Sequence, residues 1–240
     1  MSKRAREPVA NDAAGAFATI LFAKDGEAWA RELGPTAAAV LAADTYAFVA
    51  PAGPMPRVRT LTPQGAPEPV TVLETLVTDR SFVVDTIREH LRTENVEIRH
   101  VLHPLLATER DPAPDAATLG ALRRLVPLEG GADTSRESLV QVVLEPLDDA
   151  RAAAVAAGVA ARLADLVLVT DDYPALATAV RDVIGHVEHY KRGNSAWNDE
   201  VQEAQELLRW LLGGGFVFLG YRSISLEERA GVPTIVLDEG

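Results

Sequence analysis

The stretch TDRSFVVDTIREHLRTENVEIRHVLHPLL, residues 78–106, contains the pattern that decides the fold of this chain. Its first residues end a β-branched segment, its middle has the apolar spacing of a helix, and its end alternates like a strand. Val84, Ile87 and Leu91 recur on one helical face. We therefore expect the order strand, tight turn, helix, strand, with the turn at residues 79–81.

Two further apolar segments flank this unit. VTVLETLVTD (70–79) and SLVQVVLEPL (138–147) predict strands, and apolar residues at helical spacing follow in 155–166. The order strand, helix, strand, strand, helix predicts an α+β, ferredoxin-like antiparallel sheet with its helices on one face. This plan requires a fourth strand, for which residues 167–169 and 216–226 are the candidates.

The N-terminal part and the middle of the chain lack such strand patterns. Residues 13–50 predict a helical segment in two pieces, divided at the Gly-Pro pair 34–35. The proline-rich residues 51–69 predict a linker or an extended edge. Residues 107–137 have no sustained period, so we expect a long exposed loop, with one short helix near 116–125.

The C-terminal part predicts helices followed by a hairpin. DDYP (171–174) is typical of a new helix start, because aspartate caps helices and proline is tolerated in a first turn. Residues 191–199 predict a polar break, and 199–212 predict another helix. The glycines at 213–215 then end this helix. FVFLGYRSISL and TIVLD, within residues 216–238, predict two hairpin strands.

Composition limits the classes of partner. The 240 residues carry a formal net charge of −12, from 35 acidic and 23 basic side chains. Such a surface repels phosphate backbones and anionic membranes, so neither nucleic acid nor a membrane is an expected partner. No cysteine is present, which excludes disulfides and thiolate ligands. An apolar run at 13–23 resembles the core of a signal peptide, but charged residues follow it before any cleavage site. No uncharged run approaches the length of a membrane span. We therefore expect a cytoplasmic protein.

No catalytic or metal-binding constellation stands out. His186 and His189 share a helical face with Asp182, but a third strong ligand at fixed spacing is missing, so no metal site is expected. His100 and His103 are three positions apart on a predicted strand and therefore point to opposite faces. The glycine cluster follows a helix instead of preceding one, which excludes a phosphate-binding loop.

Several short motifs occur along the chain in a fixed order. They are RVRTLTP (57–63), FVVDT (82–86), HPL (103–105), LRWL (208–211) and FVFLGY (216–221). Together they resemble the N-terminal region of the large bacterial NAD-specific glutamate dehydrogenases. The chain departs from the family pattern at Ser81, where the family has proline, and at Thr86, where it has serine.

The resemblance implies a function for the intact protein. Members of the family convert L-glutamate and water to 2-oxoglutarate and ammonium, with hydride transfer to NAD, in a catalytic domain outside these 240 residues. No catalytic residue and no bound cofactor is therefore expected within this chain. The implied organisation is a helical segment and linker (1–60), an ACT-like domain (61–192), and a helix and hairpin leading to the next domain (193–240).

The resemblance also indicates a candidate effector site. ACT domains of metabolic enzymes hold amino acids beside the first strand-to-helix turn, where helix N-terminal amides attract a carboxylate. In this chain, the matching residues are Asp79, Arg80, Ser81 and Phe82. The turn has no glycine for close backbone approach, which favours scaffold and subunit contacts over an allosteric effector site. Both roles remain open at this point.

The strands indicate how the sheet is covered. The strands at 138–147 and 96–106 carry apolar residues on both faces, which is typical of strands buried on two sides. The predicted sheet helices cover only one face. We therefore expect a second subunit, or downstream domains of the same chain, to cover the other face in a homo-oligomer.

Overall fold

The structure is a computed structural model. It describes residues 9–128, 134–191, 198–215, 218–222, 224–229 and 232–237. The chain forms two compact units, Met1–Leu166 and Val167–Gly240, and helix α4 (Asp149–Lys191) contributes residues to both. The first unit holds the sheet.

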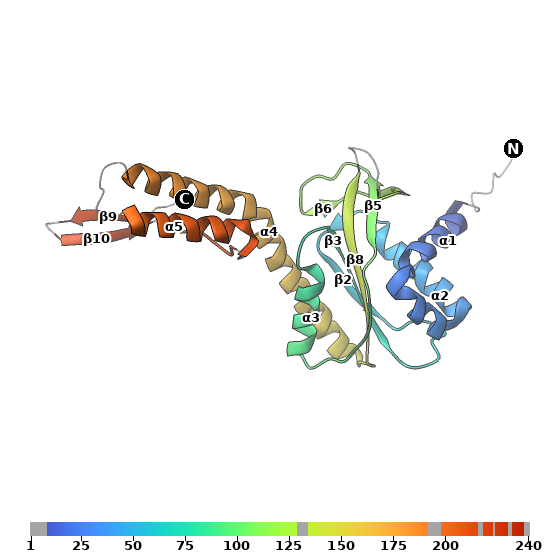
Figure 1. Ribbon diagram of the computed structural model, residues 1–240. Helices are drawn as coiled ribbons and strands as arrows, with labels where there is room; N and C mark the ends of the chain where they lie inside the picture. The colour runs from blue at the N-terminus through green and yellow to red at the C-terminus, as the bar shows by residue number, and fades with distance from the viewer. Residues whose placement is uncertain are drawn as a thin grey trace. The chain divides into compact units, whose positions relative to one another are not determined.

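The sheet of the first unit is antiparallel throughout, in the order β2-β3-β8-β5-β7, with β4 also paired to β8 (Figure 1). Its strands are β2 (Arg57–Leu61), β3 (Thr71–Thr78), β4 (Ile98–Leu102), β5 (Leu105–Arg110), β7 (Leu122–Val126) and β8 (Ser135–Leu144). The central strand β8 pairs with β3 on one side, and with β4 and β5 in succession on the other. The predicted strands at 70–79 and 138–147 are confirmed as β3 and β8.

The fourth strand of the ferredoxin-like plan comes from a segment that precedes the first. β2 pairs with β3 in antiparallel register, beside the strand that opens the strand–helix–strand unit. Both predicted sources are wrong. Residues 167–169 belong to α4. Within 216–226, residues 224–226 belong to β9 (Ile224–Arg229), which pairs with β10 (Val232–Leu237) in a separate hairpin. Residues 216, 217 and 223 lie outside the described residues.

The segment predicted as a long loop, residues 107–137, contains two complete strands, β6 (Thr118–Leu119) and β7, and also includes the end of β5 and the start of β8. β6 pairs with β1 (Gly53–Pro54), and β7 pairs with β5. The short helix predicted near 116–125 is therefore wrong. Leu119 is buried, and Leu122 and Leu125 pack against the same core cluster. This tertiary burial stabilises strands in a segment whose local pattern is weak.

Gly120, between β6 and β7, is required by a close backbone approach. A Cβ atom there would overlap the carbonyl group of Asp111. Because main chain cannot move aside as a side chain can, we expect Gly120→Ala to lower the free energy of unfolding by about 3 kcal/mol, as for severe overpacking. Urea unfolding checks this value, with Gly185→Ala as control, since that position has nothing within 4 Å of an added Cβ. Equal effects of the two changes would contradict the prediction.

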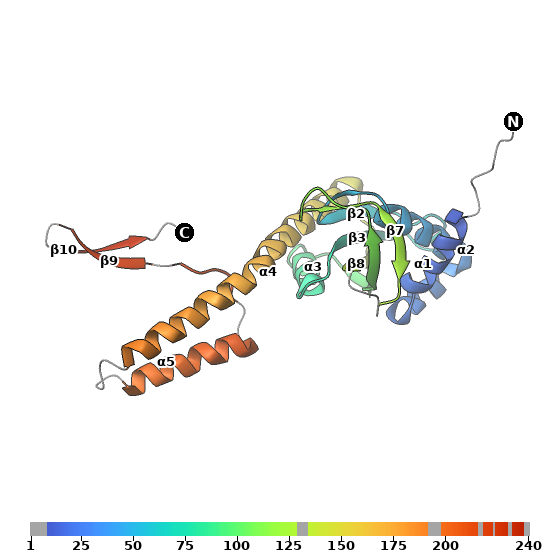
Figure 2. The same ribbon diagram turned by 90° about the horizontal axis from the view of Figure 1, so that it is seen from above.

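Helices cover both faces of the sheet, which corrects the predicted single helical layer (Figures 1 and 2). α1 (Val9–Leu21) and α2 (Glu27–Val49) pack on one face, and α3 (Val83–Thr93) and the first part of α4 lie on the other. The alternation of the strands explains this arrangement. Side chains of β3 and β8 that meet α1 and α2 are Val72, Leu76, Leu139 and Val143, and the intervening positions are equally buried.

The N-terminal helices are interrupted twice. The predicted break is present inside α2, where Gly34 has φ +76°, a value that glycine adopts without strain. A second break at the short 3₁₀ turn Lys24–Gly26 separates α1 from α2 and was not predicted. The two breaks allow the helical segment to follow the sheet surface.

In the second unit, α4 continues without a new start at DDYP, so the predicted reset at 171–174 is wrong. Pro174 is exposed, and its ring is accommodated in the helix at the cost of one backbone hydrogen bond. The predicted helix at 199–212 is present as α5 (Asn198–Trp210), followed by a π turn. Gln205 Nε2 of α5 donates to the carbonyl oxygen of Ile184 on α4, at 3.1 Å. Most of the predicted polar break at 191–199 lies outside the described residues.

The composition of α4 is apolar enough to cross a membrane. Its best 18-residue window has a mean hydropathy of 1.9, and 22% of that window is buried. Val155, Val159 and Leu163 of this helix are fully buried within the first unit. The core helix of a soluble protein can have the same length and hydropathy, so these values alone assign no membrane role.

Candidate functional site

The predicted effector residues form the turn between β3 and α3. The backbone N–H of Asp79 donates to the carbonyl oxygen of Arg136 at 2.9 Å, which ties the turn to β8. Arg80 Nε donates to the carbonyl oxygen of Thr78 at 3.2 Å. Ser81 is exposed. The structure therefore brings the four residues together at the start of α3.

Phe82 has an unusual backbone at the N-cap position of α3. Its φ is +69° and its ψ is +9°, in the left-handed region that few non-glycine residues adopt. Its side chain is 47% exposed and makes no cap hydrogen bond. The strained, exposed residue lies at the turn for which the sequence provides no glycine. Such outliers at helix starts are typical of functional positions, although they do not identify a ligand.

His103 and Ser138 complete the polar groups near this turn, and the sequence pattern had not placed them there. His103 Nε2 lies 2.6 Å from Ser138 Oγ, and Ser138 is fully buried opposite Val77 in the sheet register. Burial lowers the pKa of His103, and the negative charge of Asp79 partly opposes this effect. The break between β4 and β5 places His103 outside a regular strand, so strand periodicity does not predict its position. The HPL motif was the only sequence signal for this residue.

The lowered pKa of His103 predicts a pH dependence of stability. The ordinary pKa is 6.5, so the unfolded chain binds a proton at a higher pH than the folded chain does. The contribution of His103 is fully present above pH 6.5 and declines as the pH falls through 6.5 towards the lower folded pKa. We expect the wild-type chain to lose more stability over this window than His103→Gln, in urea unfolding at a series of pH values. Superimposable pH profiles would refute the prediction.

A buried glutamate network connects α2 to the sheet on the face beneath the N-terminal helices. Glu74 of β3 is fully buried and accepts hydrogen bonds from Arg59 Nε at 2.6 Å and Gln141 Nε2 at 2.8 Å. Thr45 Oγ1, on α2, lies 2.5 Å from the same carboxylate. Arg59 also donates to the carbonyl oxygen of Asp44 at 2.9 Å. The network therefore joins two strands of the sheet to the helix above them.

A second buried ion pair involves the neighbouring strand β8, which pairs with β3. Glu137 of β8 is fully buried and receives two hydrogen bonds from Arg110, at 2.6 and 2.8 Å, in a bidentate arrangement. Thr108 Oγ1 donates a third at 2.5 Å. Arg110 also donates to the carbonyl oxygen of Val49, the last residue of α2, at 3.0 Å.

Three guanidinium groups thus bond main-chain carbonyl groups within or just after the last two turns of α2, and those of Arg57 and Arg110 reach its last two residues. Besides Arg59 and Arg110, Arg57 donates to the carbonyl oxygens of Phe48 at 3.2 Å and Pro51 at 2.6 Å. Burial and the nearby positive charge of Arg110 lower the pKa of Arg57. Cations stabilise helix C-termini, where carbonyl groups lack helical partners. We call these residues the arginine clamp; its geometry indicates that it attaches the N-terminal helices, with no reactive group presented to a substrate.

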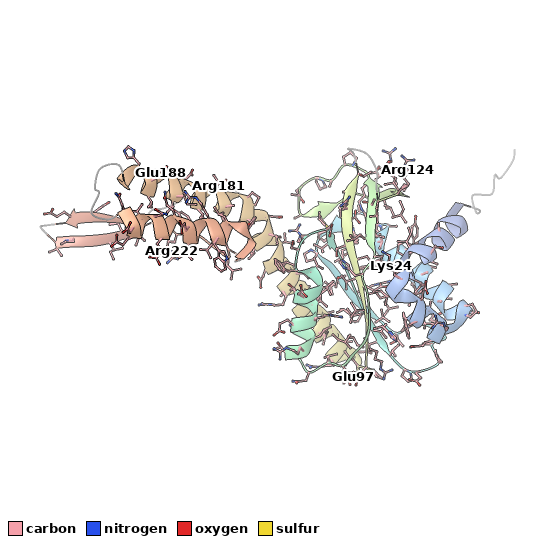
Figure 3. All side chains as sticks on the ribbon, viewed as in Figure 1. Lys24, Glu97, Arg124, Arg181, Glu188 and Arg222 are labelled. Atoms are coloured by element: carbon pink, nitrogen blue, oxygen red, sulfur yellow. The ribbon has the colours of Figure 1, made fainter. Side chains whose placement is uncertain are left out.

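Not every ion pair of the sheet is buried. Arg124 of β7 lies at the surface of the first unit (Figure 3), where it bonds Glu109 at 2.6 and 2.8 Å. On α4, His186 and His189 are exposed. Across the part of the chain that the structure describes, no three histidine or carboxylate side chains are grouped to hold a metal ion.

The chain is an α+β module. Its strands have the neighbours expected in a ferredoxin-like sheet, and an extra layer of N-terminal helices covers one face. The family described as "Glutamate dehydrogenase, ACT1 domain" matches residues 20–159, which is more than half of the chain. The chain therefore belongs to this family. The match includes α2 and β2 as well as the strand–helix–strand unit, so the arginine clamp lies within the family region.

Two curated relatives are NAD-specific glutamate dehydrogenases. The protein of Halomonas elongata is 26% identical over 181 residues, which cover 73% of this chain and 11% of the relative. The protein of Mycobacterium tuberculosis is 27% identical over 158 residues, which cover 65% of this chain and 9% of the relative. The chain thus spans about a tenth of the length of these relatives, and the sequence-based resemblance to this family is confirmed.

Proposed function

We propose that this chain is the N-terminal regulatory and assembly region of an NAD-dependent glutamate dehydrogenase. The intact enzyme would convert L-glutamate, NAD and water to 2-oxoglutarate, ammonium and NADH. The observation that carries this proposal is the family match over residues 20–159, which spans nearly the whole sheet unit. NAD would bind in the catalytic domain of the intact enzyme, and the 240-residue chain serves contacts with other domains or subunits.

Activity measurements test the two parts of this proposal separately. The full-length gene product should reduce NAD in the presence of L-glutamate, followed by NADH absorbance. The 240-residue chain should give no turnover under the same conditions. An inactive full-length protein would overturn the enzyme assignment, whereas turnover by the short chain would overturn its non-catalytic role.

We further propose that the second unit supplies the assembly contacts. The sheet face that a second subunit or downstream domains were expected to cover is covered by α1 and α2, so the premise that this face is open was wrong. In the second unit, by contrast, large apolar side chains are more than half exposed on α5 and on the hairpin. They are Leu207, Trp210, Ile224, Val232 and Ile235. Apolar side chains that gather on a surface favour contacts with another protein surface.

Light scattering of the 240-residue chain tests the assembly role. We expect self-association that weakens in the double variant Leu207→Glu/Trp210→Glu, because charge at the contact opposes burial. The paired change Glu203→Gln/Glu206→Gln, also on exposed α5 positions, is the control and should leave association unchanged. A monomeric wild-type chain that binds no hydrophobic dye would contradict the assembly role.

A sensor role at the β3–α3 turn is the second candidate. The exposed Phe82 in a left-handed conformation and the start of α3 without a side-chain cap favour it. In this role, Asp79, Arg80, Ser81 and Phe82 would contact an amino-acid effector. Titration calorimetry with a panel of amino acids distinguishes the roles. Saturable heat that Asp79→Ala abolishes would support the sensor, and flat traces throughout would support assembly alone.

A further inference from the structure

The chain passes from the first unit to the second once, within helix α4. The first unit ends at Leu166 and the second begins at Val167, and both residues lie inside this helix. Between Leu163 and Ala177, which are buried, every residue of α4 is exposed or half-buried. At 1.5 Å per residue, this span is roughly 20 Å of helix without a buried side chain. Its conformation therefore depends on the helix itself and little on packing.

The composition of this span opposes a continuous helix. The preceding turns, residues 152–164, are rich in alanine, which is the best helix former. VLVTDDYP (167–174) consists mostly of β-branched residues, aspartates, tyrosine and proline, which all have a lower helix propensity. Pro174 has no backbone N–H to donate, and a proline ring crowds the carbonyl group four residues earlier in a helix. An exposed helical span with such a sequence is only marginally stable.

Two threonine hydroxyls bond the helix backbone on either side of the proline. Thr170 Oγ1 donates to the carbonyl oxygen of Val167 at 3.2 Å, and Thr178 Oγ1 donates to that of Pro174 at 2.9 Å. Hydroxyl bonds of this kind often bend helices, and proline is the commonest cause of a sharp kink. Three features that favour bending therefore lie within residues 170–178.

We propose that α4 is a hinge that exchanges between the continuous helix and a second conformation bent at residues 171–174. The structure shows the continuous helix, in which Asp172 is exposed. In the bent conformation, Asp172 leaves the helix, and its carboxylate accepts a hydrogen bond from the backbone N–H of Ala175, as the side chain of an N-cap residue does. Pro174 then lies in the first turn of a helix, where no helical bond is lost by its missing N–H.

The two conformations differ only within the span that has no buried side chain. Leu163 remains in the core of the first unit, and Ala177 remains buried in the second. Bending therefore changes the orientation of one unit relative to the other while both cores stay intact. The proposal rests on α4 alone and requires neither the enzyme activity nor the assembly contacts proposed above.

Distances between two spin labels measure the hinge directly. The chain has no cysteine, so the labels are attached at Arg124→Cys in the first unit and Glu188→Cys in the second, positions that are labelled in Figure 3. Double electron–electron resonance is recorded on labelled chain diluted with unlabelled chain, so that association adds no further distances. We expect two distance populations for this pair and one for the reference pair Glu97→Cys/Arg124→Cys within the first unit. A distribution across the units as narrow as the reference would overturn the hinge.

Substitutions in α4 test the cause of the bend in the same labelled chain. Pro174→Ala should lower the ratio of bent to continuous chains about a hundredfold, because it restores a backbone donor and removes the ring. Asp172→Ala should lower this ratio about fivefold, the effect of a lost N-cap, whereas Asp172→Asn should change it little because asparagine also caps helices. Unchanged populations in Pro174→Ala would overturn the location of the hinge. Equal populations in Asp172→Ala and Asp172→Asn would overturn the capping role of Asp172.

Discussion

Replacing Arg110 with methionine is expected to lower the free energy of unfolding by about 3–5 kcal/mol, the cost of leaving a buried charge without its partner. Arg110 is 5% exposed and is the only cation bonded to Glu137 among the described residues. Methionine fills similar space but provides no donor, so the Glu137 carboxylate keeps only the bond from Thr108. Equilibrium urea unfolding followed by circular dichroism measures the loss.

Two further variants show whether the cost comes from the unpaired charge. The double variant Arg110→Met/Glu137→Leu removes both charges and should recover most of the stability, as apolar replacements of buried ion pairs do. Arg124→Met is the matched control, because Arg124 makes the same bidentate contact with Glu109 on the sheet surface. It should unfold like the wild type, since exposed ion pairs contribute little. A double variant no more stable than Arg110→Met would refute the assignment of the cost to the unpaired charge.

Glu74→Leu is expected to lower the free energy of unfolding by about 3 kcal/mol and to loosen α2 from the sheet. The change removes the acceptor shared by Arg59, Gln141 and Thr45, and Gln141 is fully buried, so solvent does not replace the lost bond. The Thr45 hydroxyl also donates to the carbonyl oxygen of Leu41, so it remains hydrogen-bonded without Glu74.

Hydrogen exchange separates this local effect from a uniform loss of stability. In Glu74→Leu, amides of α2 should exchange faster than amides of α3 on the opposite face, because the network joins the sheet to α2 only. Glu74→Gln keeps an acceptor oxygen for Thr45 and should have a smaller effect on both measurements. Equal acceleration in α2 and α3 would contradict an attachment role for this network.

The parts of the fold with strong local periodicity could be predicted from the sequence. β3, α3 and β8 follow directly from β-branched and helical patterns that agree with their burial. β2, at one edge of the sheet, agrees with the extended-edge alternative predicted for residues 51–69. β7 could not be predicted, because it is an edge strand with a weak pattern and is stabilised by pairing with β5. The apolar pattern of β8 correctly indicated cover on both faces. It carried no information on whether the cover came from the same chain.

The candidate site was predictable to a similar extent. The residues of the β3–α3 turn were found because a turn between a strand and a helix is a local feature. The contact of His103 with Ser138 depends on the break between β4 and β5 and on the register with β8, which the sequence does not reveal. In the sequence, Glu74 and Glu137 look like ordinary charged residues within apolar strands. Only their position beneath α2 shows that they are paired with Arg59 and Arg110.

The central position of β8 has a consequence for how the chain is made on the ribosome. β3 is synthesised long before its partner, since Thr71 pairs with Leu144. At about 5–20 residues per second, several seconds pass during which α1, α2 and β3 have emerged without the strand that completes their core. Nascent chains that stall in this interval would expose Phe17, Leu41 and Leu76 together. Chaperone binding to the nascent chain should therefore end only after residue 144 has left the exit tunnel.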